Sequence, residues 1–302
     1  MANQIVLAES QATDSRVPGK LLLLVRRIWF VLVAFLFITF LISVPGTYQM
    51  LRLACVETDP ECGSWVNIST GVVDLLAKYH ISLDGFAIIN VTAFVIVSLF
   101  CWVSGLIILR TRSYTWHGLL ASYLLISLAA GGSSFVFVMG QEFTQLPDIW
   151  KELAGLAVLP MYLSFSLFFQ TFPNGRIYPR WAHLGTLLIL ANYWVWMTPT
   201  SSNLEFWTPL LVYLWLALVY GFHIFLQGYR YRYYYSSKQR QQTKWLIFGY
   251  AIALTITITL AIFINPPYGE LLEGVTTAFG FYFPIAAGMT IAILRYNLWD
   301  ID

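Results

Sequence analysis

The chain has 302 residues, of which 58% are hydrophobic, 17% aromatic and only 11% charged, and its net charge is +2. This composition lies outside the range of soluble domains. Uncharged runs of roughly 18 to 24 residues recur, each long enough to cross about 30 Å of hydrocarbon as a helix. The composition therefore excludes a soluble globular protein and predicts an all-α, polytopic transmembrane helical bundle.

Residues 1–27 are predicted to form a polar cytoplasmic tail. Residues 1–20 contain no apolar core preceded by positive charge, so they lack the pattern of a cleavable signal peptide. The first span is expected at 28–44, where Pro45 and Gly46 should end it. An outer loop follows at 46–85, and a short helix is expected within it around 72–79.

Two cysteines of the outer loop, Cys55 and Cys62, enclose the acidic hexapeptide VETDPE. Because disulfides persist outside the cytoplasm, a disulfide is the leading interpretation, and two free thiols or a metal pair are the alternatives. Closing so short a loop would constrain the unfolded chain by about 2–3 kcal/mol. Labelling of both thiols without reductant would contradict the disulfide. The third cysteine, Cys101, is expected to pack inside a span.

Seven further spans follow in chain order, at 86–109, 119–139, 155–172, 184–198, 207–227, 245–263 and 276–294. Arg110 and Arg112 end the first of these, and the turn sequence Pro173-Asn174-Gly175 ends the span at 155–172. Pro160 and Pro284 should kink their spans. The predicted bundle of about eight spans thus covers 28–294, and a cytoplasmic exit segment follows at 295–302.

The distribution of Lys and Arg predicts the orientation. Eight spans place both termini on one side, and 14 of the 17 basic residues fall there, giving formal charges of +10 on that side and −8 on the other. By the positive-inside rule that side is the cytoplasm.

The segment 229–244, YRYRYYYSSKQRQQTK, is the most basic part of the chain and is predicted to be a cytoplasmic loop. Its basic residues are Arg230, Arg232, Lys238, Arg240 and Lys244. We expect this loop to fix the topology and to meet the anionic headgroups of the lipid bilayer. Nucleic acid is not an expected partner.

The predicted spans contain no Asp, Glu or Lys. Because ionisable groups at membrane depth mark ion paths and proton relays, their absence argues against an ion-coupled transporter and a retinal protein. Asn90 and Asn192 are expected to hydrogen-bond between helices. His117, His183 and His223 fall near the inner face without the spacing of a metal site, so no cofactor, metal or catalytic residue is predicted.

Three segments resemble the membrane-embedded sensory region of bacterial sensor histidine kinases of two-component systems. They are FPNGRIYPRW at 172–181, RYYYSSKQRQQTKWLIFG at 232–249 and ILRYNLWDID at 293–302, in the order found in that family. The resemblance implies an input module that relays an unknown stimulus through the last span to a cytoplasmic kinase core. Arg295, Trp299 and Asp300 are then the candidate signal-transmitting residues. A homodimer in the bacterial plasma (inner) membrane is implied as well.

The sequence contains neither a phospho-acceptor His in a soluble helix nor a Gly-rich ATP lid. The resemblance therefore does not carry kinase activity to this chain, and we expect no enzyme. A kinase core or response-regulator pathway would act in cis or in trans. The alternative is an accessory or structural subunit of a larger bacterial membrane complex, respiratory or photosynthetic, which would copurify with other subunits.

Overall fold

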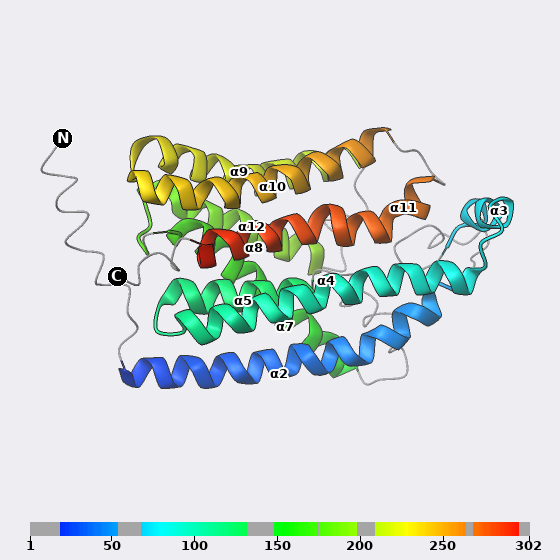
Figure 1. The fold of residues 1–302 in the computed structure, drawn as a ribbon, viewed down its shortest axis with the longest axis horizontal. Coiled ribbons are helices and arrows are strands. Elements are labelled where there is room, and N and C mark those ends of the chain that lie inside the picture. The colour runs from blue at the N-terminus through cyan, green and yellow to red at the C-terminus, as the bar shows by residue number, and fades with distance from the viewer. Residues whose placement is uncertain are drawn as a thin grey trace, which may run out of the picture.

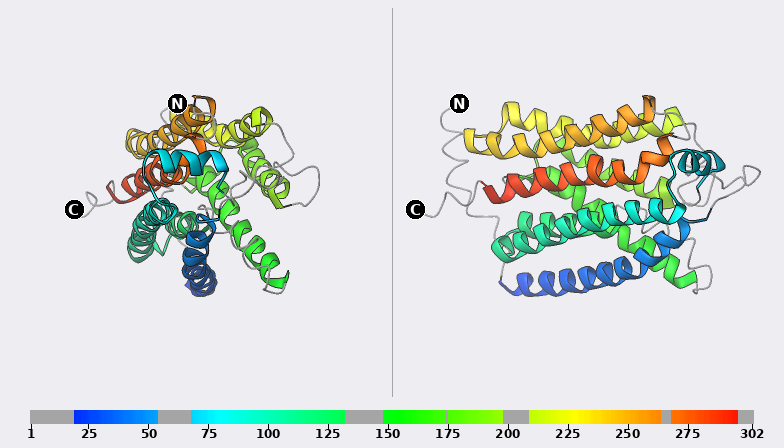
Figure 2. Two further views of the ribbon diagram at one scale, coloured as in Figure 1. Left: turned by 90° about the vertical axis from the view of Figure 1, so that its right-hand side faces the viewer. Right: turned by 45° about the vertical axis from the view of Figure 1, so that its right-hand side comes forward.

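The computed structural model describes residues 19–53, 68–131, 148–173, 175–197, 209–263 and 268–295. Within these ranges the chain is nearly all helical and contains no β-strand, which confirms the all-α prediction. The long helices lie side by side in one bundle (Figures 1 and 2).

The helices correspond closely to the predicted segments. The long ones are α2 (Gly19–Met50), α4 (Leu83–Arg112), α5 (Trp116–Gly131), α7 (Asp148–Thr171), α8 (Leu184–Met197), α9 (Pro209–Tyr233), α10 (Ser237–Phe263) and α12 (Phe283–Leu294). The short ones are α3 (Thr70–Lys78), the 3-10 helix η3 (Arg180–His183), α11 (Tyr268–Thr276) and the π-helix η5 (Thr277–Tyr282). The described part of each predicted span lies on these helices, and the last span comprises the end of α11, η5 and α12. Residues 132–139, 198 and 207–208 of the predicted spans lie outside the described residues, and α3 is the short helix expected in the outer loop.

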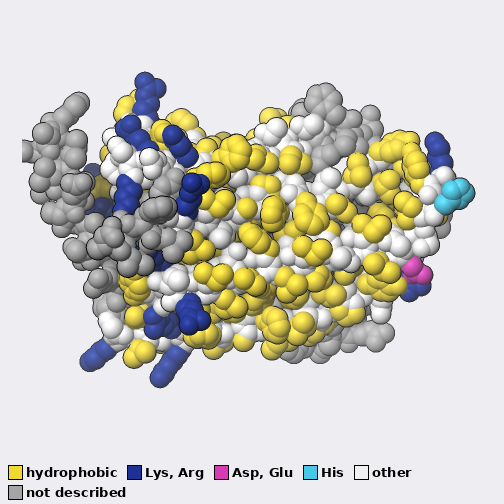
Figure 3. All heavy atoms as spheres, viewed as in Figure 1, with side chains coloured by type: hydrophobic (Ala, Val, Ile, Leu, Met, Phe, Trp, Pro, Cys, Tyr) yellow, Lys and Arg dark blue, Asp and Glu magenta, His cyan; other side chains and the backbone are white. Residues whose placement is uncertain are grey.

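Three segments of the described chain are long and apolar enough to cross a membrane, namely Gly19–Met50, Leu83–Arg112 and Gly274–Leu294. Their lengths and compositions indicate a membrane protein. In Figure 3, hydrophobic side chains cover the side of the bundle, and Lys and Arg side chains gather where α2 begins and α12 ends. We call this the basic end of the bundle, and the other the opposite end.

The boundary predicted for the first span is wrong. α2 continues through Pro45 and Gly46 to Met50. Pro45 lies on the exposed face of the helix, and α2 bends in its last turns (Figure 1). Bending is a usual way in which a helix accommodates a proline, whose missing N–H leaves the carbonyl of Leu41 without its intrahelical donor.

The predicted basic loop is instead a helical hairpin, in which only residues 234–236 connect α9 to α10. Arg230 and Arg232 therefore lie on α9, whereas Lys238, Arg240 and Lys244 lie on α10. α10 begins directly after this connection because a capping box starts the helix. Ser236 Oγ accepts from the Gln239 amide at 3.4 Å, and Gln239 Oε1 accepts from the Ser236 amide at 3.1 Å.

The main hydrophobic core lies between α2, α4, α5, α7, α10 and α12. Close approach of α4 and α5 organises part of it, since Ser98 Oγ donates to the carbonyl of Ala129 at 3.0 Å. Cys101 has no exposed surface and belongs to this core, as predicted. A second, smaller cluster lies at the opposite end, where Ile68, Val72 and Leu76 pack against Phe86.

Candidate functional site

Arg230 is the most buried charged residue of the described chain, with no exposed surface. α9 directs it at the end of α7: Nη1 donates to the carbonyls of Phe169 (3.2 Å) and Gln170 (2.7 Å), and Nη2 donates to that of Arg176 (3.1 Å). Its guanidinium also lies over the Tyr235 ring, 5.1 Å from the centroid. The expectation that Arg230 meets lipid headgroups is therefore wrong.

The chemistry of a helix end explains this burial. The last carbonyls of an α-helix have no partner within the helix and form the negative end of its macrodipole. A guanidinium suits such a place because it is always charged and presents several donors in a fixed plane. Arg230 thus acts as a C-terminal cap of α7 that comes from a different helix.

Other side chains complete this cap. The Tyr235 hydroxyl lies 2.8 Å from the Phe172 carbonyl oxygen and 2.9 Å from Gln227 Oε1. The amide nitrogen of Gln227 donates to the carbonyl of Phe169. Side chains from α9 and the α9–α10 connection therefore satisfy the end of α7, and we call this set the α7 cap: Gln227, Arg230 and Tyr235.

The described parts of the three segments that carry the resemblance, 172–173 with 175–181, 232–249 and 293–295, meet at this end of the bundle. Tyr178 and Tyr234 stack with ring centroids 5.8 Å apart and an interplanar angle of 9°. The Tyr235 hydroxyl bonds the Phe172 carbonyl, as described above. Arg295, in the third segment, lies over the ring of Trp245, in the second, 5.6 Å from its centroid.

Arg240 repeats the pattern of Arg230 one helix later. Its Nε donates to the carbonyl of Tyr235 at 3.1 Å and its Nη2 to that of Arg232 at 3.3 Å, so α10 holds the end of α9. The side chains of Arg232, Lys238 and Lys244 are exposed at the basic end. Their contact with anionic headgroups stays a prediction. Trp299 and Asp300, like Cys55 and Cys62, lie outside the described residues.

A polar cluster continues from the α7 cap into the bundle. His223 Nδ1 lies 2.7 Å from the Val219 carbonyl and so carries the proton in the neutral ring, which makes Nε2 an acceptor for Ser166 Oγ at 3.2 Å. Gln170 Nε2 donates to Ser166 Oγ and to Thr186 Oγ1, each at 2.7 Å. The cluster thereby joins α7, α8 and α9 by side-chain hydrogen bonds.

The hydrogen bond between Ser166 and His223 has the composition of a nucleophile–base pair, but its surroundings favour a packing role. Neither residue has exposed surface. Phe165 packs its ring 5.0 Å from that of His223, and a Cβ at Gly185 would come within 3.0 Å of His223 Nε2. Because no room for a substrate lies beside the pair, we interpret it as an interhelical contact of the kind that polar residues make in membrane bundles.

The remaining polar predictions are placed as follows. Asn192 accepts from Trp215 Nε1 at 2.9 Å, which confirms an interhelical bond between α8 and α9. Asn90 differs, because its amide nitrogen donates to the carbonyl of Phe86 in its own helix at 3.0 Å. His183 is exposed. Among the described residues no three His, Cys, Asp or Glu side chains come together as metal ligands would.

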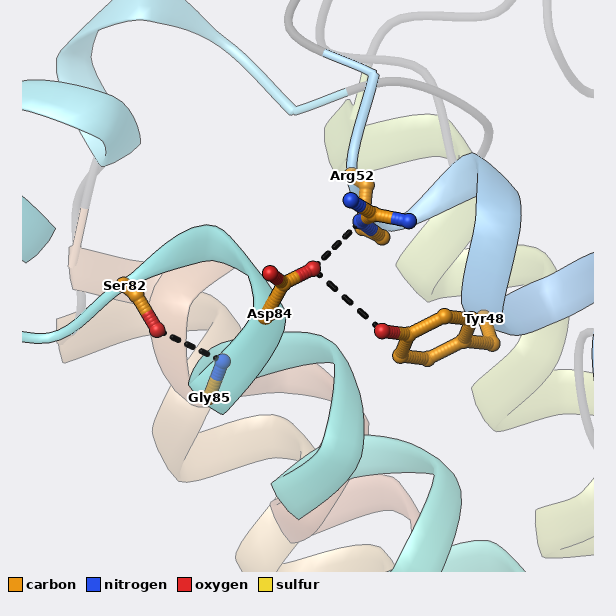
Figure 4. A network of polar contacts seen from close by, with 5 residues as sticks. All are labelled: Tyr48, Arg52, Ser82, Asp84 and Gly85. Atoms are coloured by element: carbon orange, nitrogen blue, oxygen red, sulfur yellow. Dashed lines mark hydrogen bonds and ion pairs between the residues drawn. The ribbon is translucent and has the colours of Figure 1, made fainter.

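The opposite end holds an exposed polar contact between α2 and α4 (Figure 4). Arg52 Nε lies 2.5 Å from Asp84 Oδ1, and the Tyr48 hydroxyl donates to the same oxygen at 3.3 Å. Ser82 caps α4 by accepting from the Gly85 amide at 3.0 Å. Since the side chains of Arg52 and Asp84 are 47% and 52% exposed, the pair contributes little stability and serves to align two helix ends.

Comparison of the chain with protein-family models, with curated proteins and with solved structures finds no match.

Most of the α7 cap is not predicted from the sequence. Arg230 is expected only to set the topology and meet lipid headgroups, and the sequence predicts no partner for Gln227 or for the Tyr235 hydroxyl. One signal was available: Phe172-Pro173-Asn174-Gly175 was predicted to end a helix, and a helix end needs partners for its last carbonyls.

Proposed function

We propose that this chain is a multi-pass protein of the bacterial plasma membrane, with eight spans and both termini in the cytoplasm, that serves as the sensory input module of a two-component signalling system. In this proposal the basic end faces the cytoplasm, as the positive-inside rule requires. A kinase core, in cis or in trans, receives the signal from the exit segment after α12. The module acts as a homodimer, because histidine kinase cores of the resembling family work in pairs.

The observation that supports this function best is the way in which α12 is joined to the rest of the basic end. α12 packs on α10 through glycines: a Cβ at Gly249 would lie 2.3 Å from the Pro284 carbonyl oxygen, and one at Gly288 would lie 2.7 Å from that of Trp245. Backbones this close leave no side chain between the two helices, so a shift of α10 acts directly on α12. Arg295 extends the contact by lying over Trp245.

A series of arginines therefore connects the bundle interior to the exit. Arg230 of α9 holds the end of α7, Arg240 of α10 holds the end of α9, and Arg295 lies on α10. A stimulus that changes the packing of α7 against α9 would shift α10 and, through the glycine contact, α12. Such a change of packing between two arrangements is the general physical basis of signal transmission.

The test fuses the full chain, after Asp302, to the core of a histidine kinase and measures autophosphorylation in membrane vesicles. Linkers of zero to four added residues should change the output with a period of about 3.6 residues, because each residue turns a helix by about 100°. Gly249→Ala should shift the output. Gly221→Ala is the matched control, since a Cβ at Gly221 has no atom within 4 Å.

The sensory function would be refuted if autophosphorylation of the fusion stays the same at every linker length and in the Gly249→Ala variant, in proteins that insert normally. Copurification of the unfused chain with other membrane subunits would then support the accessory subunit.

A further inference from the structure

The last predicted span contains a π-helix, η5, between α11 and α12. Its position has a local cause. In α geometry the ring of Pro284 would clash with the carbonyl of the residue four positions earlier, Gly280, and would leave that carbonyl without its donor. The π turn ends at Tyr282, two residues before this proline, and removes the conflict. Single π turns of this kind hold an extra residue and are frequent at functional sites.

The segment before the π turn is held by the opposite end of the bundle. A Cβ at Gly274 of α11 would lie 1.9 Å from Asn90 Oδ1, so α11 touches α4 with no space between them. Leu271, also on α11, packs against the cluster that includes Val72 and Leu76 of α3. The position of α11 is therefore tied to the outer helix α3.

The segment after the π turn is held by α10 instead. Gly249 and Gly288 bring α10 and α12 together, as described above, and Arg295 lies over Trp245. The two sides of the π turn thus belong to two different neighbours, one at each end of the bundle. Because the π turn holds one extra residue between α11 and α12, a change in this turn can accompany a shift of one helix relative to the other.

We propose that η5 is a register switch for α12. If α11 stays in place while the π turn returns to α geometry, α12 advances by one residue toward the basic end, which is a rotation of about 100° and a translation of about 1.5 Å. Leu294 then takes the place that Arg295 now has beside Trp245, and Ala287 takes that of Gly288, so α12 also moves away from α10 to admit the alanine Cβ. This inference rests on the proposed sensory function and specifies its regulation: a change at α3 and α11 is converted into a rotation of the exit segment.

The test measures the register directly, without a kinase. Full-length protein in membrane vesicles, with its three native cysteines replaced by alanine, carries Trp245→Cys with either Arg295→Cys or Leu294→Cys. A short bifunctional thiol reagent then reports which position lies nearer to 245. We expect position 295 to cross-link several-fold better than position 294 in the parent protein.

Pro284→Ala removes the cause of the π turn and should shift the cross-linking ratio several-fold toward position 294. Pro160→Ala, the same substitution inside α7, is the control and should leave the ratio unchanged. Deleting Phe279 in the Pro284→Ala protein removes the extra residue and should restore the preference for position 295. This deletion keeps the test decisive if Pro284→Ala alone folds poorly.

A ratio that stays the same in the Pro284→Ala protein, or a deletion that fails to restore it, would overturn the register switch. The register switch would also be overturned by a third outcome. In it, the cross-linking ratio shifts and linker length still changes the output of the kinase fusion, but the shift in ratio leaves that output unaltered. A fusion that ignores linker length in every variant contradicts the sensory function instead, so the two failures are distinguishable.

Discussion

Replacing Arg230 by methionine removes the central donor of the α7 cap while keeping a long, unbranched side chain with good helix propensity. The matched control is Arg232→Met, the same change two residues away on the same helix. Arg232 is exposed, and its recorded ring contact is with Tyr233, 5.6 Å from the centroid. Both variants lose one positive charge from the basic end, so the comparison isolates the effect of burial.

The magnitude follows from the carbonyls that lose their donor. Three of them accept from Arg230, those of Phe169, Gln170 and Arg176. Leaving a buried acceptor unsatisfied costs about 1–3 kcal/mol. Hydrogen bonds in membrane proteins are worth less, about 0.6 kcal/mol on average, because the unfolded chain in the membrane finds other partners. We therefore expect Arg230→Met to lower the free energy of unfolding by roughly 3–5 kcal/mol, whereas an exposed cation–π contact is worth about 0.5–1 kcal/mol.

The assay is thermal unfolding of the full chain in one detergent, followed by the amount of monodisperse protein that remains. With about 2–4 °C per kcal/mol, Arg230→Met should lower the midpoint by about 6–20 °C and Arg232→Met by no more than about 4 °C. Arg230→Lys should lie closer to Met than to the parent, because an ammonium cannot present the planar fork of donors. Equal midpoints for Arg230→Met and Arg232→Met would refute the cap.

The other predictions concern single contacts. Tyr235→Phe removes the hydroxyl at the α7 cap and should cost about 1–2 kcal/mol in a chemical or thermal melt, against no measurable loss for the exposed Tyr234→Phe. Gly249→Ala should destabilise by more than about 2 kcal/mol because its Cβ would meet a carbonyl oxygen at 2.3 Å, whereas Gly221→Ala should be neutral or slightly stabilising; a stable Gly249→Ala protein would contradict the close backbone contact. Asp84→Asn should change the melting midpoint by less than the equivalent of about 1 kcal/mol at any salt concentration, since its ion pair is exposed.

The positions of the helices could be predicted because one physical constraint sets them. Every apolar run long enough to span hydrocarbon must satisfy its backbone internally, and a helix does so residue by residue. The described part of each predicted span accordingly lies on helices, and the turn at Pro173 is found where expected. The prediction that the first span ends at Pro45 is wrong because an exposed proline within a membrane helix is tolerated when the helix bends. Composition alone does not reveal that bend.

The α7 cap could not be predicted, because its contacts join residues far apart in the sequence. Gln227 and Arg230 lie more than 50 residues from the carbonyls that they hold. The start of α10 was predictable in part, since Ser236 and Gln239 have the spacing of a capping box. A charge count treats all arginines alike. Burial separates Arg230 from Arg232, and burial depends on which face of α9 meets α7.

The side chains of Arg230, Arg240 and Arg295 suit their positions for a physical reason beyond their charge. Arg230 donates to three carbonyls at once and Arg240 to two, which a lysine ammonium on a flexible stem does less precisely. The contacts of Arg230 and Arg240 hold the end of a helix rather than its side, so a helix can tilt about each contact without breaking it. α7, α9 and α10 are thus linked in series at the basic end, while the glycine contact joins α10 to α12 along their length. In the proposed sensory function, a stimulus that reaches α7, α9 or α10 would act on the exit segment through the contact between α10 and α12.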